Sequence, residues 1–273
     1  MKLINNIVFI TLFILLTFIA SSSFAAQNII IKDTPQAIDL AGKQRMLTQR
    51  MLKNYVLLAM NKGVASEKQQ LEQDILLFSN TLEALNNYTE SINYNIPSDN
   101  VEMYWGMLQQ LLSTQPSKIV VTELQRGLDT LLEETNRYTV ALTKRSGQNS
   151  SIIINISGKQ RMFSQRLASL YFINLLGIKD KDFQKKLDAS IQSFEKTQTK
   201  LEQYSRNTAS INKKLKQVSL SFKFFTDLAS GKIKNPMPLM INLNSNAIMQ
   251  NMDKITKEYA QSAVKPTWGQ SPI

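Results

Sequence analysis

Apolar residues recur at i, i+3, i+4 and i+7 through most of this 273-residue chain, whereas runs that alternate between apolar and polar residues are nearly missing. The first spacing places apolar side chains on one face of an α-helix, and the second pattern would be needed for half-buried strands. The sequence therefore predicts an all-α fold.

Glycine, proline, asparagine and serine divide this pattern into eight amphipathic segments, in two groups of four. Four such helices are the usual content of an antiparallel four-helix bundle, so two tandem bundles are expected, at 34–145 and 150–263, followed by an irregular tail at 264–273. The expected helices are 34–61, 66–94, 99–113 and 118–145 in unit one, and 150–176, 180–206, 210–229 and 238–263 in unit two.

One phrase is written twice. AGKQRMLTQRM at Ala41–Met51 returns as SGKQRMFSQRL at Ser157–Leu167, an offset of 116 residues (42 to 158). The same offset carries Phe78 onto Phe194, far outside the phrase. A match that holds its register over this length indicates a duplicated domain, with the phrase on the first helix of each copy.

Polar residues interrupt the inner stripe of each of these first helices, where a core helix would place leucines. They are Gly42, Arg45 and Gln49 in unit one and Gly158, Arg161 and Gln165 in unit two. A guanidinium at a helix interface is costly unless paired, and its planar fork of donors suits an oxyanion. A glycine one turn earlier lets a ligand approach the backbone. The pattern predicts an anion pocket between helices.

Two other interpretations remain open at this point. Arg45 could pair with Glu102, Glu133 or Glu134 on a neighbouring helix, with the glycine merely allowing close packing. The phrase would then be a folding motif, and the protein a structural or adaptor protein that docks onto a membrane chemoreceptor or pilus component without a small ligand.

The repeated phrase resembles the P-box of the PilJ/NarX-type sensor family, which comprises periplasmic four-helix domains of pilus-associated chemotaxis transducers and nitrate/nitrite sensor kinases. The resemblance covers about residues 34–263 and implies a sensor that binds nitrate or nitrite. It implies that the glycine backbone and the arginine hold the anion between two such helices, usually at a dimer interface. Carried over, these positions are Gly42 and Arg45, and Gly158 and Arg161.

Two departures from the family pattern modify this expectation. The asparagine that precedes the family's glycine by three residues is matched by Asn155, but unit one has Asp39 there, which favours unit two as the anion site. Family members normally continue into a membrane helix and a signalling module, which this sequence does not show. A separate partner, such as a membrane chemoreceptor or sensor kinase, is therefore expected to receive the signal.

The segment Ser146–Ser151 decides how the two P-boxes meet. A break there would let the units lie side by side, so that Arg45 could face Arg161 within one chain. No proline forces a turn, however, and a continuous helix would place the P-boxes far apart. The sequence favours the second arrangement, with an elongated homodimer that pairs P-boxes between chains.

The remaining features exclude several classes of protein. Residues 1–25 read as a secretory signal peptide, which predicts a periplasmic location; an uncleaved membrane anchor is the alternative. The net charge of +11 comes from scattered basic residues, which argues for a solvated face rather than a nucleic-acid partner. Cysteine and histidine are absent, so thiol and histidine catalysis and most metal sites are excluded, and neither an enzyme nor a cofactor is expected.

Secondary roles are expected for other residues of the phrase. Lys43 and Arg50 point away from the inner stripe and are predicted to be surface charges or to lie behind the pocket, and Met46 and Met162 are predicted to pack in the core.

Overall fold

The computed structural model describes residues 29–63, 65–96, 98–235 and 237–264, in which eight helices and no strand are present. The all-α prediction is therefore confirmed. The expected signal peptide at 1–25 lies outside the described residues, and so do residues 265–273 of the expected irregular tail. Val264, the first residue of that expected tail, is instead the last residue of a helix. No helix in the described ranges is long and apolar enough to cross a membrane.

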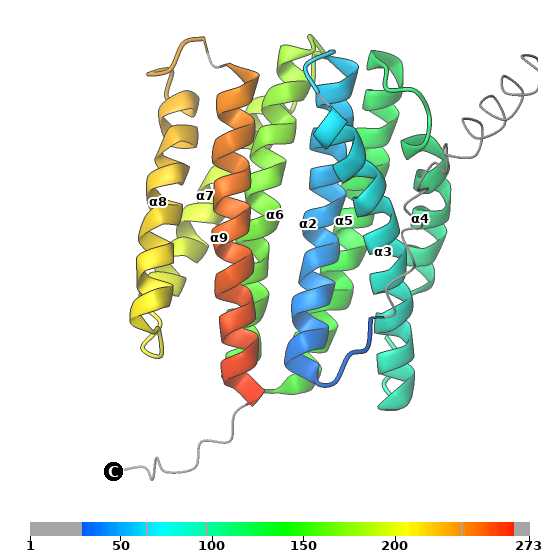
Figure 1. Cartoon of the computed structure of the whole chain (residues 1–273), viewed down its shortest axis with the longest axis vertical. Helices are drawn as coiled ribbons and strands as arrows, with labels where there is room; N and C mark the ends of the chain where they lie inside the picture. Colours follow the sequence, from blue (N-terminus) through cyan, green and yellow to red (C-terminus); the bar gives the residue numbers. More distant parts are fainter. Residues whose placement is uncertain (1–28, 64, 97, 236, 265–273) are drawn as a thin grey trace, which may run out of the picture.

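The helices form two antiparallel sets of four that lie side by side (Figure 1). Unit one consists of α2 (Thr34–Ala59), α3 (Ala65–Ser91), α4 (Asp99–Leu112) and α5 (Lys118–Ser146). Unit two consists of α6 (Asn149–Leu175), α7 (Phe183–Glu202), α8 (Ala209–Ala229) and α9 (Pro238–Val264). The predicted bounds hold within a few residues, except that α7 starts three residues later and ends four earlier than expected.

Side-chain caps mark the starts of α2, α5 and α8. Asp33 accepts a hydrogen bond from the Gln36 backbone N–H, and Pro35 occupies the first turn of α2, where its missing N–H does not matter. Ser117 and Thr208 cap α5 and α8 in the same manner. These caps satisfy backbone N–H groups of the first turn and help to fix where these three helices begin.

The duplication is visible in the packing of the outer helices. In unit one Phe78 of α3 lies against Trp105 of α4, with ring centroids 4.2 Å apart. In unit two Phe194, the repeat equivalent of Phe78, stacks on Phe222 of α8 at 3.9 Å. The same aromatic contact thus joins the outer pair of helices in both units, and the buried residues of the two units form one connected core.

The connection between the units is broken, so the expected continuous helix is wrong. Helix α5 ends at Ser146, and Gly147 adopts a left-handed conformation with φ of 64° before α6 begins at Asn149. A left-handed glycine is a common way to end a helix, because it has no Cβ to clash. The chain reverses there, which lays α6 beside α2 in the same direction (Figure 1).

Helices α2 and α6 form the most extensive contact between the units, with α5 packed on α2 and α9 packed on α6. This arrangement brings the two P-boxes together within a single chain. The prediction that each P-box finds its twin in a second chain is thus wrong for this fold. The two units can pack in this way because α2 and α6 are each buried almost all round.

Candidate functional site

The centre of the α2–α6 contact is a pair of glycines. A Cβ added at Gly42 would lie 3.8 Å from the Gly158 Cα, and one added at Gly158 would lie 3.7 Å from the Gly42 Cα. Two helices approach this closely only where side chains are absent. The repeated glycine therefore sets the distance between the units.

Arg45 and Arg161 enter the space beside the glycines. The Nη2 atoms of Arg45 and Arg161 lie 3.1 and 3.3 Å from the position that a Gly42 Cβ would take, and both lie 3.3 Å from the corresponding position at Gly158. Both side chains are fully buried. Two guanidinium groups thus approach each other inside the protein, an arrangement that requires negative charge nearby.

Arg161 has that negative charge from two carboxylates. Its Nη2 lies 2.7 Å from Asp39 Oδ1 of unit one, and its Nη1 lies 2.8 Å from Asp253 Oδ1 on α9. Nη2 also donates to the Asp39 backbone carbonyl at 3.0 Å. Burial alone would lower the pKa of Arg161, but the charges of Asp39 and Asp253 outweigh it and raise that pKa.

Arg45 has amides at the equivalent places. Its Nη1 donates to Asn136 Oδ1 on α5 at 2.9 Å, and its Nη2 donates to the Asn155 backbone carbonyl of unit two at 3.1 Å. Within the described ranges no carboxylate pairs with Arg45. Burial, followed by the charge of Arg161, lowers the pKa of Arg45 to about 9, so the group remains charged at neutral pH.

The three glutamates considered as partners of Arg45 lie elsewhere, and that interpretation is wrong. Glu134 pairs with Arg137, and Glu102 accepts hydrogen bonds from Asn86 and Ser98. Glu133 is exposed and lines a cavity of about 560 Å³ beside Asp129 and Asp180. The partner on the fourth helix is instead Asn136.

The lysines of the two P-boxes repeat this asymmetry. Lys43 lies 3.9 Å from Asp253, and Lys257 lies 2.8 Å from the same carboxylate. Lys159, the equivalent of Lys43, has a pKa lowered by burial and then by the positive charges of Arg45 and Lys200. One half of the site is therefore close to neutral, and the other half carries positive charge with amides around it.

The remaining predicted residues lie in the same interface. Gln49 and Gln165 are buried one turn beyond the arginines: Gln49 Oε1 accepts from Arg166 at 3.4 Å and Gln165 donates to the Ser245 carbonyl at 3.1 Å. The buried polar atoms that have no hydrogen-bond partner among the described residues include Arg45 Nε, Asn155 Oδ1 and Gln165 Oε1 of this interface. Arg161 Nε shares this condition.

Among the predictions for the other residues of the phrase, those for the methionines agree with the structure and that of a surface charge at Arg50 does not. Met46 and Met162 are buried in the core, as predicted. Arg50 is not a surface charge, because its guanidinium pairs with the fully buried Asp74 at 2.5 Å. Lys43 is also largely covered, and it lines a surface cavity of about 470 Å³ together with Asp39 and Lys257.

Sequence reasoning missed Asp253, Asn136 and Lys159 as members of the site. Asp253 and Asn136 occupy equivalent places on α9 and α5, but they are 117 residues apart (136 to 253), one more than the offset of the P-boxes. A fixed-offset comparison therefore does not align them. A search for polar residues inside the apolar stripes of the fourth helices could have found both.

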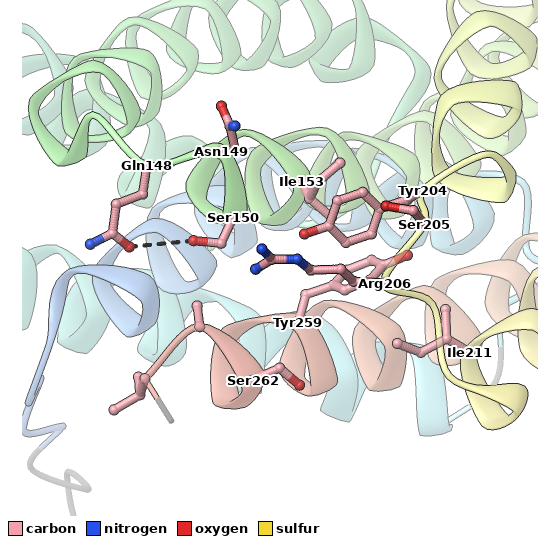
Figure 2. Close-up of a pocket in the computed structure, with 12 residues that line it drawn as sticks. Gln148, Asn149, Ser150, Ile153, Tyr204, Ser205, Arg206, Ile211, Tyr259 and Ser262 are labelled. Carbon is pink, nitrogen blue, oxygen red and sulfur yellow. Dashed lines mark hydrogen bonds between the residues drawn. The ribbon is translucent and has the colours of Figure 1, made fainter. Parts of the chain in front are cut away.

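A larger cavity, of about 700 Å³, lies at the end of unit two and contains none of the predicted site residues (Figure 2). The first turn of α6, the α7–α8 turn and the last turns of α9 form its walls, and the Arg206 side chain extends into it. It is separate from the P-box pair.

Comparison with known families identifies the duplicated unit. The chain matches the family described as type IV pili methyl-accepting chemotaxis transducer N-term, PilJ, over residues 32–138 and 142–222. The chain belongs to this family. The PilJ family is a sensory rather than a catalytic one, and the two matched segments agree with tandem copies. No curated protein and no solved structure matches the chain.

Proposed function

We propose that this PilJ-family protein is an exported, periplasmic sensor that binds a small oxyanion, such as nitrate or nitrite, between its two P-boxes. The observation that supports this most directly is the fully buried Arg45, which faces a second buried arginine and has amides in place of carboxylates. An uncompensated buried charge costs several kcal/mol, and a bound anion would remove that cost. A planar oxyanion also fits the fork geometry of a guanidinium.

The proposed ligand would act on the contact that holds the units together. The arginines fill the space between Gly42 and Gly158, so an anion enters only if α2 and α6 shift or an arginine changes its rotamer. Binding then favours one of two arrangements of these helices, which is the usual basis of a ligand-driven switch. We propose that a separate membrane chemoreceptor or sensor kinase detects this change, in keeping with the family's transducer role.

Calorimetry on the mature protein with nitrate, nitrite, sulfate and urate tests the proposal. Heat is expected with nitrate or nitrite, and it should disappear in Arg45→Met, which removes the unpaired charge and keeps a similar apolar volume. Absence of heat with every anion, at protein concentrations that detect millimolar affinity, would refute the binding proposal.

A second candidate function, an adaptor without a small ligand, is favoured by one observation. Arg161 already has two carboxylates, and the P-box pair is closed over both guanidinium groups. Arg161→Ala does not separate the two functions, because it would leave Asp39 and Asp253 without their main partner in either case. Arg45→Met separates them when it is compared with the wild type. If the protein is an adaptor, the wild type binds no anion and the Arg45→Met variant still retains its partner in a pull-down.

A further inference from the structure

The two halves of the P-box pair are built alike but differ by two negative charges. Each arginine donates Nη2 to the backbone carbonyl of the residue three positions before the opposite glycine, which is Asp39 for Arg161 and Asn155 for Arg45. Each donates Nη1 to the fourth helix of its own unit, to Asp253 or to Asn136. Carboxylates thus occupy both places around Arg161, and amides occupy both places around Arg45.

The carboxylate of Asp39 crosses between the units. It comes from the P-box helix of unit one and lies 2.7 Å from the arginine of unit two. The expectation that Asp39 disfavours its own unit therefore reverses. Asp39 supplies an anion to Arg161, whereas Asn155, at the equivalent position, leaves Arg45 without one.

We propose, on the basis of the proposed function above, that Asp39 is a built-in substitute for the ligand, so that one chain takes up a single anion and holds it on Arg45. Asp39 and Asn155 are then the residues that determine which half of the duplicated site stays open. Arg45, Asn136, Asn155 and Lys159 form the recognising half, and Arg161 with its two aspartates forms a half whose charge is already compensated.

The geometry around the open half agrees with this assignment. The Nε atoms of Arg45 and Arg161 both have no partner in the part of the chain that the structure describes, so they do not distinguish the halves. The side chains at the equivalent positions do: Asp39 Oδ1 lies 2.7 Å from Arg161 Nη2, whereas Asn155 Oδ1 is buried without a partner in that part of the chain. The amide of Asn155 can also present its N–H₂ group to an anion, which a carboxylate cannot do. The positive charges of Arg45 and Lys159 favour an anion over a cation or a neutral ligand.

Exchanging the side-chain amide and carboxylate at positions 155 and 39 tests the inference. Asn155→Asp supplies the missing carboxylate to Arg45, and Asp39→Asn removes the existing one from Arg161. Nitrate titrations by calorimetry and melting temperatures without nitrate are measured for both variants and for the wild-type chain. Asn212→Asp, at an exposed position of α8, is the matched control for the added charge.

We expect one nitrate per wild-type chain, at least about tenfold weaker binding in Asn155→Asp, and a higher melting temperature of that variant without nitrate. Asp39→Asn should melt at a lower temperature without nitrate and should bind a second anion. Unchanged affinity in Asn155→Asp together with unchanged stoichiometry in Asp39→Asn would overturn the inference while leaving the proposed function intact. No binding by the wild type or by Asp39→Asn would instead refute the proposed function.

Discussion

Single residues of the P-box pair have opposite expected effects on stability even though they are copies of one another. Arg161 is paired with the buried Asp39 and with the partly exposed Asp253, whereas Arg45 is a buried charge among amides. Breaking a buried ion pair leaves an uncompensated charge, but removing an uncompensated charge relieves the protein of its desolvation penalty. Equivalent positions in the two repeats are therefore not equivalent in energy.

The first prediction compares Arg161→Met with Arg45→Met in the absence of ligand. We expect Arg161→Met to lower the free energy of unfolding by about 3–5 kcal/mol, because Asp39 and Asp253 lose their main partner. Arg45→Met should leave stability within about 1 kcal/mol of the wild type or raise it. Urea denaturation of both variants measures the difference, and equal losses in the two would contradict the charge asymmetry.

The second prediction concerns Lys53, a fully buried lysine whose Nζ lies 2.6 Å from Asn246 Oδ1 on α9. Burial, followed by the charge of Arg50, lowers its pKa to about 7, against the attraction of Asp74 and Glu67. Above pH 7 the folded protein releases this proton while the unfolded chain keeps it up to about pH 10.4. The unfolded state then binds more protons, so this group makes stability rise with pH across that window.

Lys53→Met should flatten the rise and increase the free energy of unfolding at pH 6 to 7 by a few kcal/mol, because the buried charge is removed. Denaturation curves at pH 6, 7, 8.5 and 9.5 measure the effect. Lys62→Met, at an exposed lysine near the end of the same helix, is the control and should leave the pH profile as it is. A profile that Lys53→Met does not change would show that folding does not lower the pKa of this lysine, which then keeps its proton in the folded protein across this range.

At the scale of the helices, the close contact between α2 and α6 depends on the absence of side chains at Gly42 and Gly158. Sequence periodicity predicted eight helices and the inner position of both P-boxes, because apolar stripes report directly on helix rotation. It did not predict that the stripes of α2 and α6 face each other. Gly147 decides that point, since the same residue is tolerated inside a helix at about 1 kcal/mol or ends it in a left-handed turn.

The third prediction is that Gly42→Ala and Gly158→Ala destabilise the protein although alanine is the better helix former. A Cβ at Gly42 would meet Arg45 Nη2 at 3.1 Å and Arg161 Nη2 at 3.3 Å, and hydrogen bonds or ion pairs hold both groups in place. We expect a loss of about 1–3 kcal/mol, as for overpacked cores.

Gly106→Ala is the matched control for this test. Gly106 lies inside α4 and an added Cβ would have no neighbour within 4 Å, so alanine there should stabilise by up to about 1 kcal/mol. Thermal denaturation of the three variants gives the comparison. If all three alanine substitutions stabilised the protein, Arg45 and Arg161 would be able to move away from an added methyl group at little cost.

For the whole molecule, the duplicated chain brings two P-boxes together without a second subunit. The sequence indicated both copies through one repeated phrase, but the closing contacts are made by residues that break the repeat. Asp39 replaces the asparagine seen as Asn155, and Asp253 stands where unit one has Asn136. The effect of these differences can be seen only when α2 and α6 lie side by side, because Asp39 then contacts Arg161 and Asn155 contacts Arg45 across the two units.

The last prediction follows from this internal pairing: the protein needs no second chain to assemble the site and should be a compact monomer. Domains of about 240 residues have a radius of gyration of about 18 Å when compact. A continuous helix through Ser146–Ser151 would instead span on the order of 90 Å from residue 117 to 176, at about 1.5 Å per residue. Small-angle scattering separates these shapes through the radius of gyration, and the forward intensity gives the mass of the particle.

Gly147 makes the turn between the two units, and its φ of 64° suits glycine and strains any other side chain. Gly147→Ala should therefore lower the free energy of unfolding by about 1 kcal/mol without changing the scattering curve, because contacts along α2 and α6 still hold the units together. A dimeric, elongated particle in the wild type would show that the P-boxes pair between chains after all.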